Sequence, residues 1–211
     1  AEAGLTADMQ HAARLGVRAY SLVTALTCQD AVAFTRLTAV ADADLIEAVR
    51  ALRRQSPPQV AKIGLIASLH QLRLLIREIR ALFPACRIVW DPILRTSSGV
   101  DLLPDASRES LLKVAELVDV ILPNHYESHQ LFGESIPHEW VERTATAVIA
   151  KSASSTEEDV TDRAYLPDGR LIESTAPRLG EDRHGTGCLY ATTLCAALAR
   201  GEDYQEALHA A

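Results

Sequence analysis

Short runs of apolar residues alternate with longer segments of helical periodicity along most of this chain. The apolar runs lie at residues 19–26, 60–66, 87–90, 118–122 and 145–150. A strand that is apolar throughout is buried on both faces, which is typical of parallel sheets covered by helices on each side. We therefore predict an α/β fold of three layers (α/β/α), in which a central, mostly parallel sheet lies between helices.

Capping signals mark the helices expected between these runs. Ser68 precedes a segment whose leucine and isoleucine residues recur at helical spacing. Asp44 with Glu47, and Asp203 with Glu206, have the spacing of a capping box, which predicts a helix start at each place. The expected helices cover residues 5–15, 44–54, 69–82, 107–116 and 185–200, and a hairpin is expected around residues 167–169.

The composition argues against several classes of protein. The 211 residues are 48% hydrophobic and 23% charged, which indicates a folded core rather than disorder. The formal charge of −7 disfavours a dedicated nucleic-acid-binding protein. No apolar run approaches the roughly 20 residues of a membrane-crossing helix, and residues 1–8 do not resemble a signal peptide. We expect a single domain over residues 1–211 with neither a membrane nor a nucleic acid as its partner.

The four cysteines are scattered, with no Cys-x-x-Cys pair and no spacing suited to zinc. A chain of this length and apolar content rarely depends on a disulfide framework. We therefore expect reduced thiols and a cytoplasmic protein.

Polar residues follow several of the expected strands. Gln29 follows the first apolar run, while Asp91, Asn124 and Lys151 come directly after later runs. In a parallel sheet the carboxyl ends of the strands lie along one edge, and ligands bind outside that edge. We expect these four side chains to collect there.

The strongest local signal is the sequence His-Gly-Thr-Gly-Cys at residues 184–188, immediately before an expected helix. Glycines allow the backbone to approach a ligand closely, and the N-terminus of a helix attracts anions. Cys188 lies in the first turn, where a thiolate is favoured and can act as a base or nucleophile. The alternative is an ordinary glycine-rich turn that carries a buried cysteine.

Asn124 and Glu127 follow a strand with the spacing of a helix cap. The same carboxylate and amide can organise a hydrated Mg²⁺, which keeps several of its waters; the two roles are compatible. Asp91 is either a carboxylate near a metal or simply the end of a strand. Asp8 and Gln29 can pair with a small heterocycle, although an aspartate on a helix is usually solvated.

These pieces occur in an order that resembles the hydroxymethylpyrimidine and phosphomethylpyrimidine kinases of thiamin biosynthesis, a ribokinase-like family. The residues at 184–188 match the family's HGTGC segment outright. The other matching segments are GLTAD at residues 4–8, SLVTALTCQD at 21–30, KIGL at 62–65, DPI at 91–93 and PNHYE at 123–127. The similarity spans nearly the whole chain and fades between residues 133 and 180.

The resemblance implies a ribokinase-like fold and phosphoryl transfer from Mg·ATP to 4-amino-5-hydroxymethyl-2-methylpyrimidine, with its monophosphate as a further substrate. It implies that Asp8 and Gln29 hold the aminopyrimidine and that Leu65 packs near the ring. It also assigns an anion hole with a catalytic thiol, formed by Gly185, Thr186, Gly187 and Cys188.

For the nucleotide, the resemblance implies that Asn124 and Glu127 serve Mg²⁺ and that Lys151 reaches an ATP phosphate. Asp91 and Glu127 are the expected carboxylates near the metal. It further implies a homodimer. The family also has a first strand with a glycine-rich turn and a C-terminal helical segment, and we expect both to lie outside this chain. The segment between Phe132 and Ala145 is short for the helix that the family resemblance leads us to expect there.

Three alternatives remain open at this point. A pyridoxal or pyridoxine kinase acts on a similar ring that bears a hydroxymethyl group. A non-catalytic, pyrimidine-sensing domain is suggested by Ser152, Ala153 and Ser154, which replace the family's Gly-Gly-His after Lys151. A cysteine hydrolase would need a histidine beside Cys188, and His184 is the nearest in sequence.

Overall fold

The computed structural model describes residues 4–29, 34–96, 98–178 and 185–211. Its centre is a six-stranded sheet of order β3-β4-β5-β6-β7-β8. Strands β3 to β6 are parallel, whereas β7 and β8 are antiparallel to their neighbours. The strands are β3 (Val60–Ile63), β4 (Arg87–Trp90), β5 (Val120–Ile121), β6 (Ala147–Ser155), β7 (Asp159–Tyr165) and β8 (Leu171–Pro177). The predicted α/β fold is confirmed.

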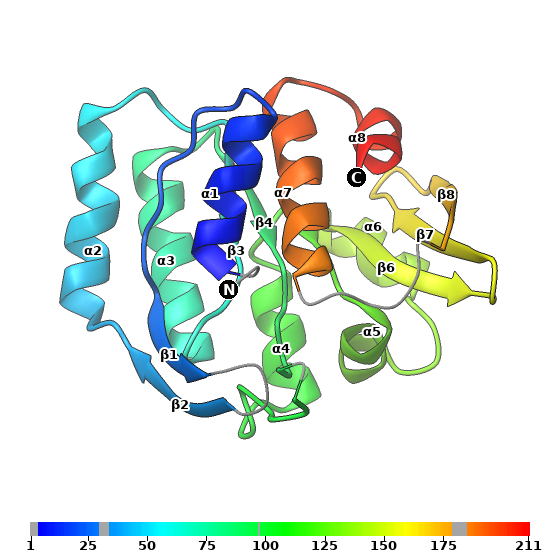
Figure 1. Cartoon of the computed structure of the whole chain (residues 1–211), viewed down its shortest axis with the longest axis horizontal. Helices are drawn as coiled ribbons and strands as arrows, with labels where there is room; N and C mark the ends of the chain where they lie inside the picture. Colours follow the sequence, from blue (N-terminus) through cyan, green and yellow to red (C-terminus); the bar gives the residue numbers. More distant parts are fainter. Residues whose placement is uncertain (1–3, 30–33, 97, 179–184) are drawn as a thin grey trace.

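Helices cover both faces of the sheet (Figure 1). One face carries α3 (Leu69–Leu82), α4 (Arg108–Ala115), α5 (His125–Phe132) and α6 (His138–Thr144), with α2 (Asp42–Ala51) and the short 3₁₀ turn η1 (Leu52–Arg54) packed outside α3. The other face carries α1 (Gly4–Arg14), α7 (Thr186–Ala199) and α8 (Tyr204–Ala210). Helix α1 lies beside α7, so segments from the start and from the last quarter of the chain pack together on one face.

The two-residue period of a strand explains why the central strands are apolar throughout. Ile88 and Trp90 of β4 pack into the core under α3 and α4. Val89, between them, packs into the opposite core under α7 and α8. All three side chains are fully buried. A polar residue on either face of β4 would therefore be buried in one core or the other.

Several predicted caps are confirmed, and one is wrong. The Ser68 side chain accepts a hydrogen bond from the Gln71 N–H, and Asp203 forms a capping box with Glu206. The box expected at Asp44 is absent, because α2 begins two residues earlier, after Ala41, whose side chain makes no cap. Helix α6 occupies part of the stretch that seemed too short for a helix.

The strand expected at residues 19–26 is also wrong in its bounds. The strand is β1 (Ala25–Gln29), which pairs with β2 (Phe34–Ala39) in an antiparallel ribbon separate from the central sheet. The ribbon is little buried, and the Leu26 side chain is 62% exposed. The Thr24 carbonyl just before β1 bonds with Gln71 and Val40 rather than with a neighbouring strand of the sheet.

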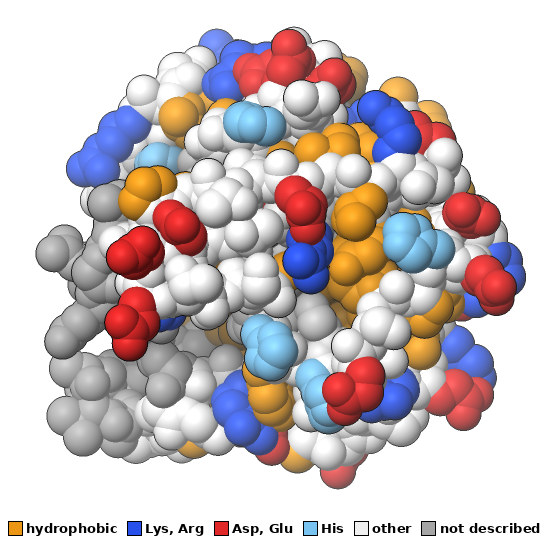
Figure 2. All heavy atoms as spheres, turned by 90° about the vertical axis from the view of Figure 1, so that its right-hand side faces the viewer, with side chains coloured by type: hydrophobic (Ala, Val, Ile, Leu, Met, Phe, Trp, Pro, Cys, Tyr) orange, Lys and Arg blue, Asp and Glu red, His pale blue; other side chains and the backbone are white. Residues whose placement is uncertain are grey.

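The side of the molecule that carries the antiparallel end of the sheet exposes acidic, basic and apolar side chains (Figure 2). Exposed ion pairs on its hairpin join Arg163 to Glu173 and Arg170 to Asp168. A search of the helices in the described segments finds none with the length and apolar content to cross a membrane.

Gln71 should be a main anchor of the ribbon. Its buried side chain donates to the Thr24 and Val40 carbonyls, which flank the ribbon, and accepts from the Ala67 N–H. Gln71→Leu leaves these backbone groups without their partner inside the protein, so we expect a loss of about 3 kcal/mol in unfolding free energy. Urea denaturation measures it. Gln130→Leu, at an exposed position, is the control. Equally small losses of unfolding free energy in the two variants would contradict the role of Gln71 as an anchor.

Candidate functional site

The carboxyl edge of the sheet holds a buried ion pair. Asp91 follows β4 and Lys151 lies on β6, and their Oδ1 and Nζ atoms are 2.6 Å apart. The two side chains are only 3% and 12% exposed. The pair spans β5, which lies between the two strands. The prediction that Asp91 and Lys151 meet at this edge is confirmed.

An irregularity in β6 accompanies this placement of Lys151. The pairing of β6 with β7 shifts register between Ala150 and Ser154. Within this bulge Ser152 has a left-handed φ of 50°, and its N–H donates to Asp162 Oδ1 at 2.6 Å. The Lys151 N–H donates to the Pro123 carbonyl, which holds the bulge against the end of β5. The bulge thus sits directly at the ion pair, as bulges beside sites often do.

A second ion pair joins three elements next to the first. Lys62 of β3 donates to both oxygens of Asp8 on α1, at 2.7 and 2.8 Å. The Thr192 hydroxyl of α7 donates to Asp8 Oδ1 at 2.9 Å. A carboxylate has about four acceptor positions, so Asp8 retains the capacity to accept from a ligand. Its role toward a pyrimidine stays a prediction, as do those of half-buried Leu65 and of Gln29, which is exposed on β1.

Both lysines remain charged in spite of their burial. Burial by itself would lower the pKa of Lys62, but the carboxylates of Asp91 and Asp8, together with Cys188, raise that pKa above its ordinary value. For Lys151, burial is likewise outweighed by Asp91, Glu127 and Cys188, and its pKa is raised. Cys188 therefore lies near both lysines.

These groups form a row of alternating charge along the edge, which we call the charge row. Its members are Asp8, Lys62, Asp91, Lys151 and Glu127. Each cation has a carboxylate on both sides, which is the arrangement that makes buried charges tolerable.

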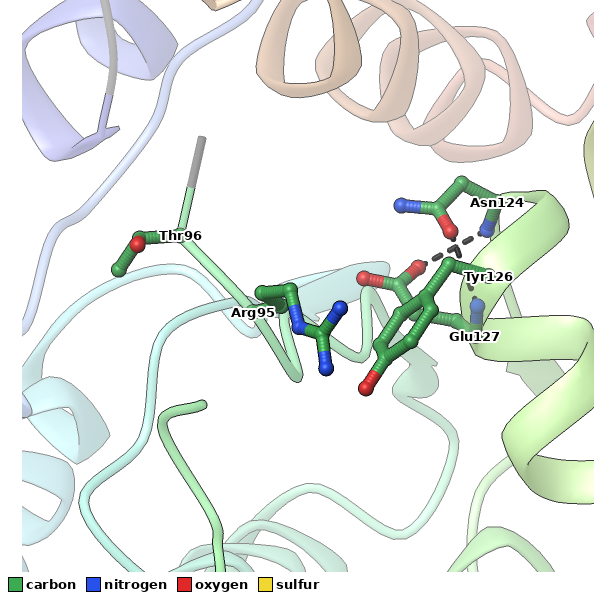
Figure 3. Close-up of a pocket in the computed structure, with 5 residues that line it drawn as sticks. All are labelled: Arg95, Thr96, Asn124, Tyr126 and Glu127. Atoms are coloured by element: carbon green, nitrogen blue, oxygen red, sulfur yellow. Dashed lines mark hydrogen bonds between the residues drawn. The ribbon is translucent and has the colours of Figure 1, made fainter. Parts of the chain in front are cut away.

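Glu127 closes the row at the start of α5. Its Oε2 accepts from the Asn124 N–H at 2.8 Å, and its own N–H donates to the Asn124 side chain at 2.9 Å (Figure 3). The capping box predicted here is therefore present. Burial raises the pKa of Glu127 to about 7, against the lowering effect of Lys151 and of its hydrogen bonds.

The N-terminus of α7 lies over Lys151. Gly185 precedes the helix with a φ of 99°, a conformation that strongly favours glycine. A Cβ on Gly187 would stand 3.8 Å from Lys151 Nζ, so this turn approaches the ion pair closely. Cys188 is partly buried in the first helical turn, while His184 lies outside the described residues. The structure thus brings residues 185–188 together with the charge row.

A pocket of about 410 Å³ opens beside Glu127. Arg95 and Thr96, on the loop after β4, form one side, and Asn124, Tyr126 and Glu127 at the start of α5 form the other (Figure 3). Arg95, Tyr126, Lys62 and Thr192 were not identified as site residues from the sequence. Lys62 could have been recognised from the sequence, because it is a lone lysine in an apolar strand. No local pattern distinguishes Arg95, Tyr126 or Thr192 as a site residue.

The row offers two carboxylates to a hard cation. Asp91 Oδ1 bonds Lys151, and Glu127 Oε1 accepts only a long bond of 3.4 Å from the Leu94 N–H. Within the described ranges no three histidine, cysteine or acidic side chains converge as a metal cage. Mg²⁺ is commonly held by one or two carboxylates, waters and phosphates. The donor set therefore fits Mg²⁺ rather than a cation that needs a full protein cage.

Comparison with known proteins places this site in a family. The family model described as phosphomethylpyrimidine kinase matches residues 1–211. The chain belongs to the phosphomethylpyrimidine kinase family. The curated relatives of this family include a hydroxymethylpyrimidine/phosphomethylpyrimidine kinase of Rhizobium meliloti, 31% identical over 225 residues, a match that covers 99% of this chain and 82% of the relative.

Some of the family's relatives are much longer than this chain. A probable thiamine biosynthetic bifunctional enzyme of rice is 26% identical, and the match covers 99% of this chain but 40% of the rice protein. For the multifunctional protein ThiED of Corynebacterium efficiens, 28% identical, the shares are 98% and 29%. The matched region is therefore one part of those two proteins.

Solved structures share the fold of this family member. A phosphomethylpyrimidine kinase of Clostridium difficile superposes with a TM-score of 0.75 at 21% identity and covers 98% of this chain and 88% of that one. A pyridoxal kinase of Staphylococcus aureus, solved in complex with AMP-PCP, gives 0.79 at 21% identity, with shares of 99% and 79%. At these identities the likeness establishes the ribokinase-like fold and does not choose between the two substrates.

The burial of Glu127 predicts a pH dependence of stability. Its folded pKa of about 7 exceeds the ordinary 4.5, so the folded state binds more protons between these values and stability falls as the pH rises through them. Glu127→Gln keeps the capping geometry but cannot ionise. We expect the variant to match the wild type at pH 4.5 and to be more stable by up to about 3 kcal/mol at pH 7.5 without divalent cations. Urea denaturation at a series of pH values gives the unfolding free energy of each protein. A constant difference between the two proteins from pH 4.5 to pH 7.5 would refute this.

Proposed function

We propose that this chain transfers a phosphoryl group from ATP to the hydroxymethyl group of 4-amino-5-hydroxymethyl-2-methylpyrimidine, and to the resulting monophosphate, in thiamine biosynthesis. The observation that carries the proposal is the match of the whole chain to a kinase family. In this chain the glycine-rich turn and Cys188 lie beside a buried row of paired charges, which supports the same function. Phosphoryl transfer depends mainly on positioning and on neutralising charge, which such an edge supplies.

The acceptor side of the reaction falls to the α7 turn. In the proposed step the hydroxymethyl oxygen bonds to the γ-phosphorus, the bond from that phosphorus to the bridging oxygen of ADP breaks, and the hydroxyl proton passes to Cys188, which takes part as a thiolate and leaves the step as a thiol. The anion hole for the moving group consists of Gly185, Thr186, Gly187 and Cys188. Asp8, Gln29 and Leu65 bind the aminopyrimidine ring.

The donor side falls to the α5 end of the charge row. Lys151, Asn124 and Glu127 bind the nucleotide, and Asp91 with Glu127 holds Mg²⁺. A bound Mg²⁺ neutralises phosphate charge. The ion pair of Asp91 with Lys151 supports this assignment. It places a carboxylate for the metal and an ammonium for a phosphate 2.6 Å apart, so a metal–nucleotide complex can contact both.

The family resemblance supports two further proposals. The first is a homodimer, which light scattering on the purified protein tests directly. The second is a cytoplasmic location, where Mg·ATP is available; cell fractionation tests it.

Cys188→Ala should separate chemistry from binding. Without the thiol the proton has no designated acceptor, so we expect kcat to fall about 100-fold while the KM for hydroxymethylpyrimidine stays within a factor of two or so. A coupled ADP-release assay with Mg·ATP measures both. Cys86→Ala, in the core beneath the opposite face of the sheet, is the matched control and should keep wild-type kcat.

The same assay, together with calorimetric binding of hydroxymethylpyrimidine to the wild type, decides among the alternatives. Faster turnover of pyridoxal than of hydroxymethylpyrimidine would reassign the substrate. Tight pyrimidine binding with no ADP release from the wild type would indicate a sensing domain. Wild-type kcat in Cys188→Ala would remove the thiol from the mechanism and leave the kinase assignment standing.

A further inference from the structure

Arg95 lines the pocket beside Glu127 but is not a member of the charge row. Figure 3 shows its side chain reaching from the loop after β4 toward the first turn of α5. The guanidinium carbon lies 4.1 Å from the centre of the Tyr126 ring, a cation–π contact. Its Nε donates to Asp101 Oδ1 at 2.7 Å across a small β-bridge within the same loop.

The pocket has a need that Arg95 can meet. Lys62 and Lys151 are each committed to a carboxylate inside the charge row. Among the residues that the structure describes along the pocket, Arg95 alone has a permanent positive charge, and Glu127 is the acid. An anion that enters this pocket therefore meets Arg95 as a cation of the pocket lining itself, in addition to the Lys151 that we propose for the nucleotide.

The present partner of Arg95 is easily exchanged. Arg95 and Asp101 are 41% and 49% exposed, and ion pairs in such positions contribute little because water screens them. A guanidinium, unlike an ammonium, offers two parallel N–H groups to a phosphate. The cation–π contact with Tyr126 holds the guanidinium beside the first turn of α5.

We infer that Arg95 is a phosphate-binding residue of this pocket, which exchanges Asp101 for a phosphate group of a substrate. The inference rests on the proposed function and deepens it. Two sources of phosphate are compatible with the same chemistry, ATP and the phosphorylated pyrimidine. Adenosine is the matched ligand without phosphate for ATP, and hydroxymethylpyrimidine is the matched ligand for the phosphorylated pyrimidine.

Calorimetric binding of these four ligands to Arg95→Ala tests the inference without relying on turnover. We expect the Kd of at least one phosphorylated ligand to rise about tenfold, as loss of a charged hydrogen bond predicts, with no change for the ligand that lacks phosphate. The affected pair identifies the source. Asp101→Asn, which removes the negative charge that competes for Arg95, should shift the same Kd in the opposite direction.

Arg170→Ala is the control, since Arg170 forms a pair with Asp168 on the β7–β8 hairpin that is even more exposed than the pair of Arg95 with Asp101. It should leave all four constants unchanged. Equal weakening of adenosine and ATP by Arg95→Ala would overturn the inference in favour of base stacking, and wild-type constants throughout would overturn it outright. If the wild type turns over while Arg95→Ala binds normally, the inference alone fails; a wild type that binds neither phosphorylated ligand contradicts the proposed function too.

Discussion

The buried pair of Asp91 and Lys151 is the interaction on which the rest of this site depends. Neither charge is stable at this depth alone, because burial without a partner costs several kcal/mol. The pair connects the end of β4 to the bulge within β6, across β5. It also fixes what lies around it: Glu127 on one side, and Cys188 with Lys62 on the other.

A row of paired charges suits phosphoryl transfer because its dipoles are already oriented before the substrate arrives. The cations of the row are neutralised by their own carboxylates, so the edge is polar without a large net charge. Arg95, outside the row and weakly paired, is the group that can change partner. The site thus combines fixed charges that define its geometry with one cation that is free to respond to a ligand.

Local patterns predicted the parts of the fold that local forces determine. The apolar run of β4 is buried in two cores at once, and the hydroxyl of Ser68 and the capping box at Asp203 mark helix starts as expected. The ribbon of β1 and β2 escaped prediction because its place depends on Gln71, a residue more than 40 positions from Thr24. Asp44 gave a false cap because Asp42, two residues earlier, already begins the helix.

The candidate site shows the same division. Asp91, Asn124, Glu127 and Lys151 could be found from their positions after strands, since the carboxyl ends of parallel strands share an edge. The partners of these residues could not. The contacts of Lys62 with Asp8 and of Thr192 with Asp8 join segments 54 and 184 residues apart. No local pattern encodes such pairs; only the packing of α1 against α7 brings them together.

A double-mutant cycle on Asp91 and Lys151 measures whether the two buried charges stabilise each other. Lys151→Met and Asp91→Asn should each lower the unfolding free energy by about 3–5 kcal/mol, because each disrupts a buried charge pair. The double variant should lose much less than the sum of the two, with a coupling energy of roughly 2 kcal/mol or more. Losses that add to within about 0.5 kcal/mol would show that the two charges are independent, and would contradict the account of this edge as a site built on one ion pair.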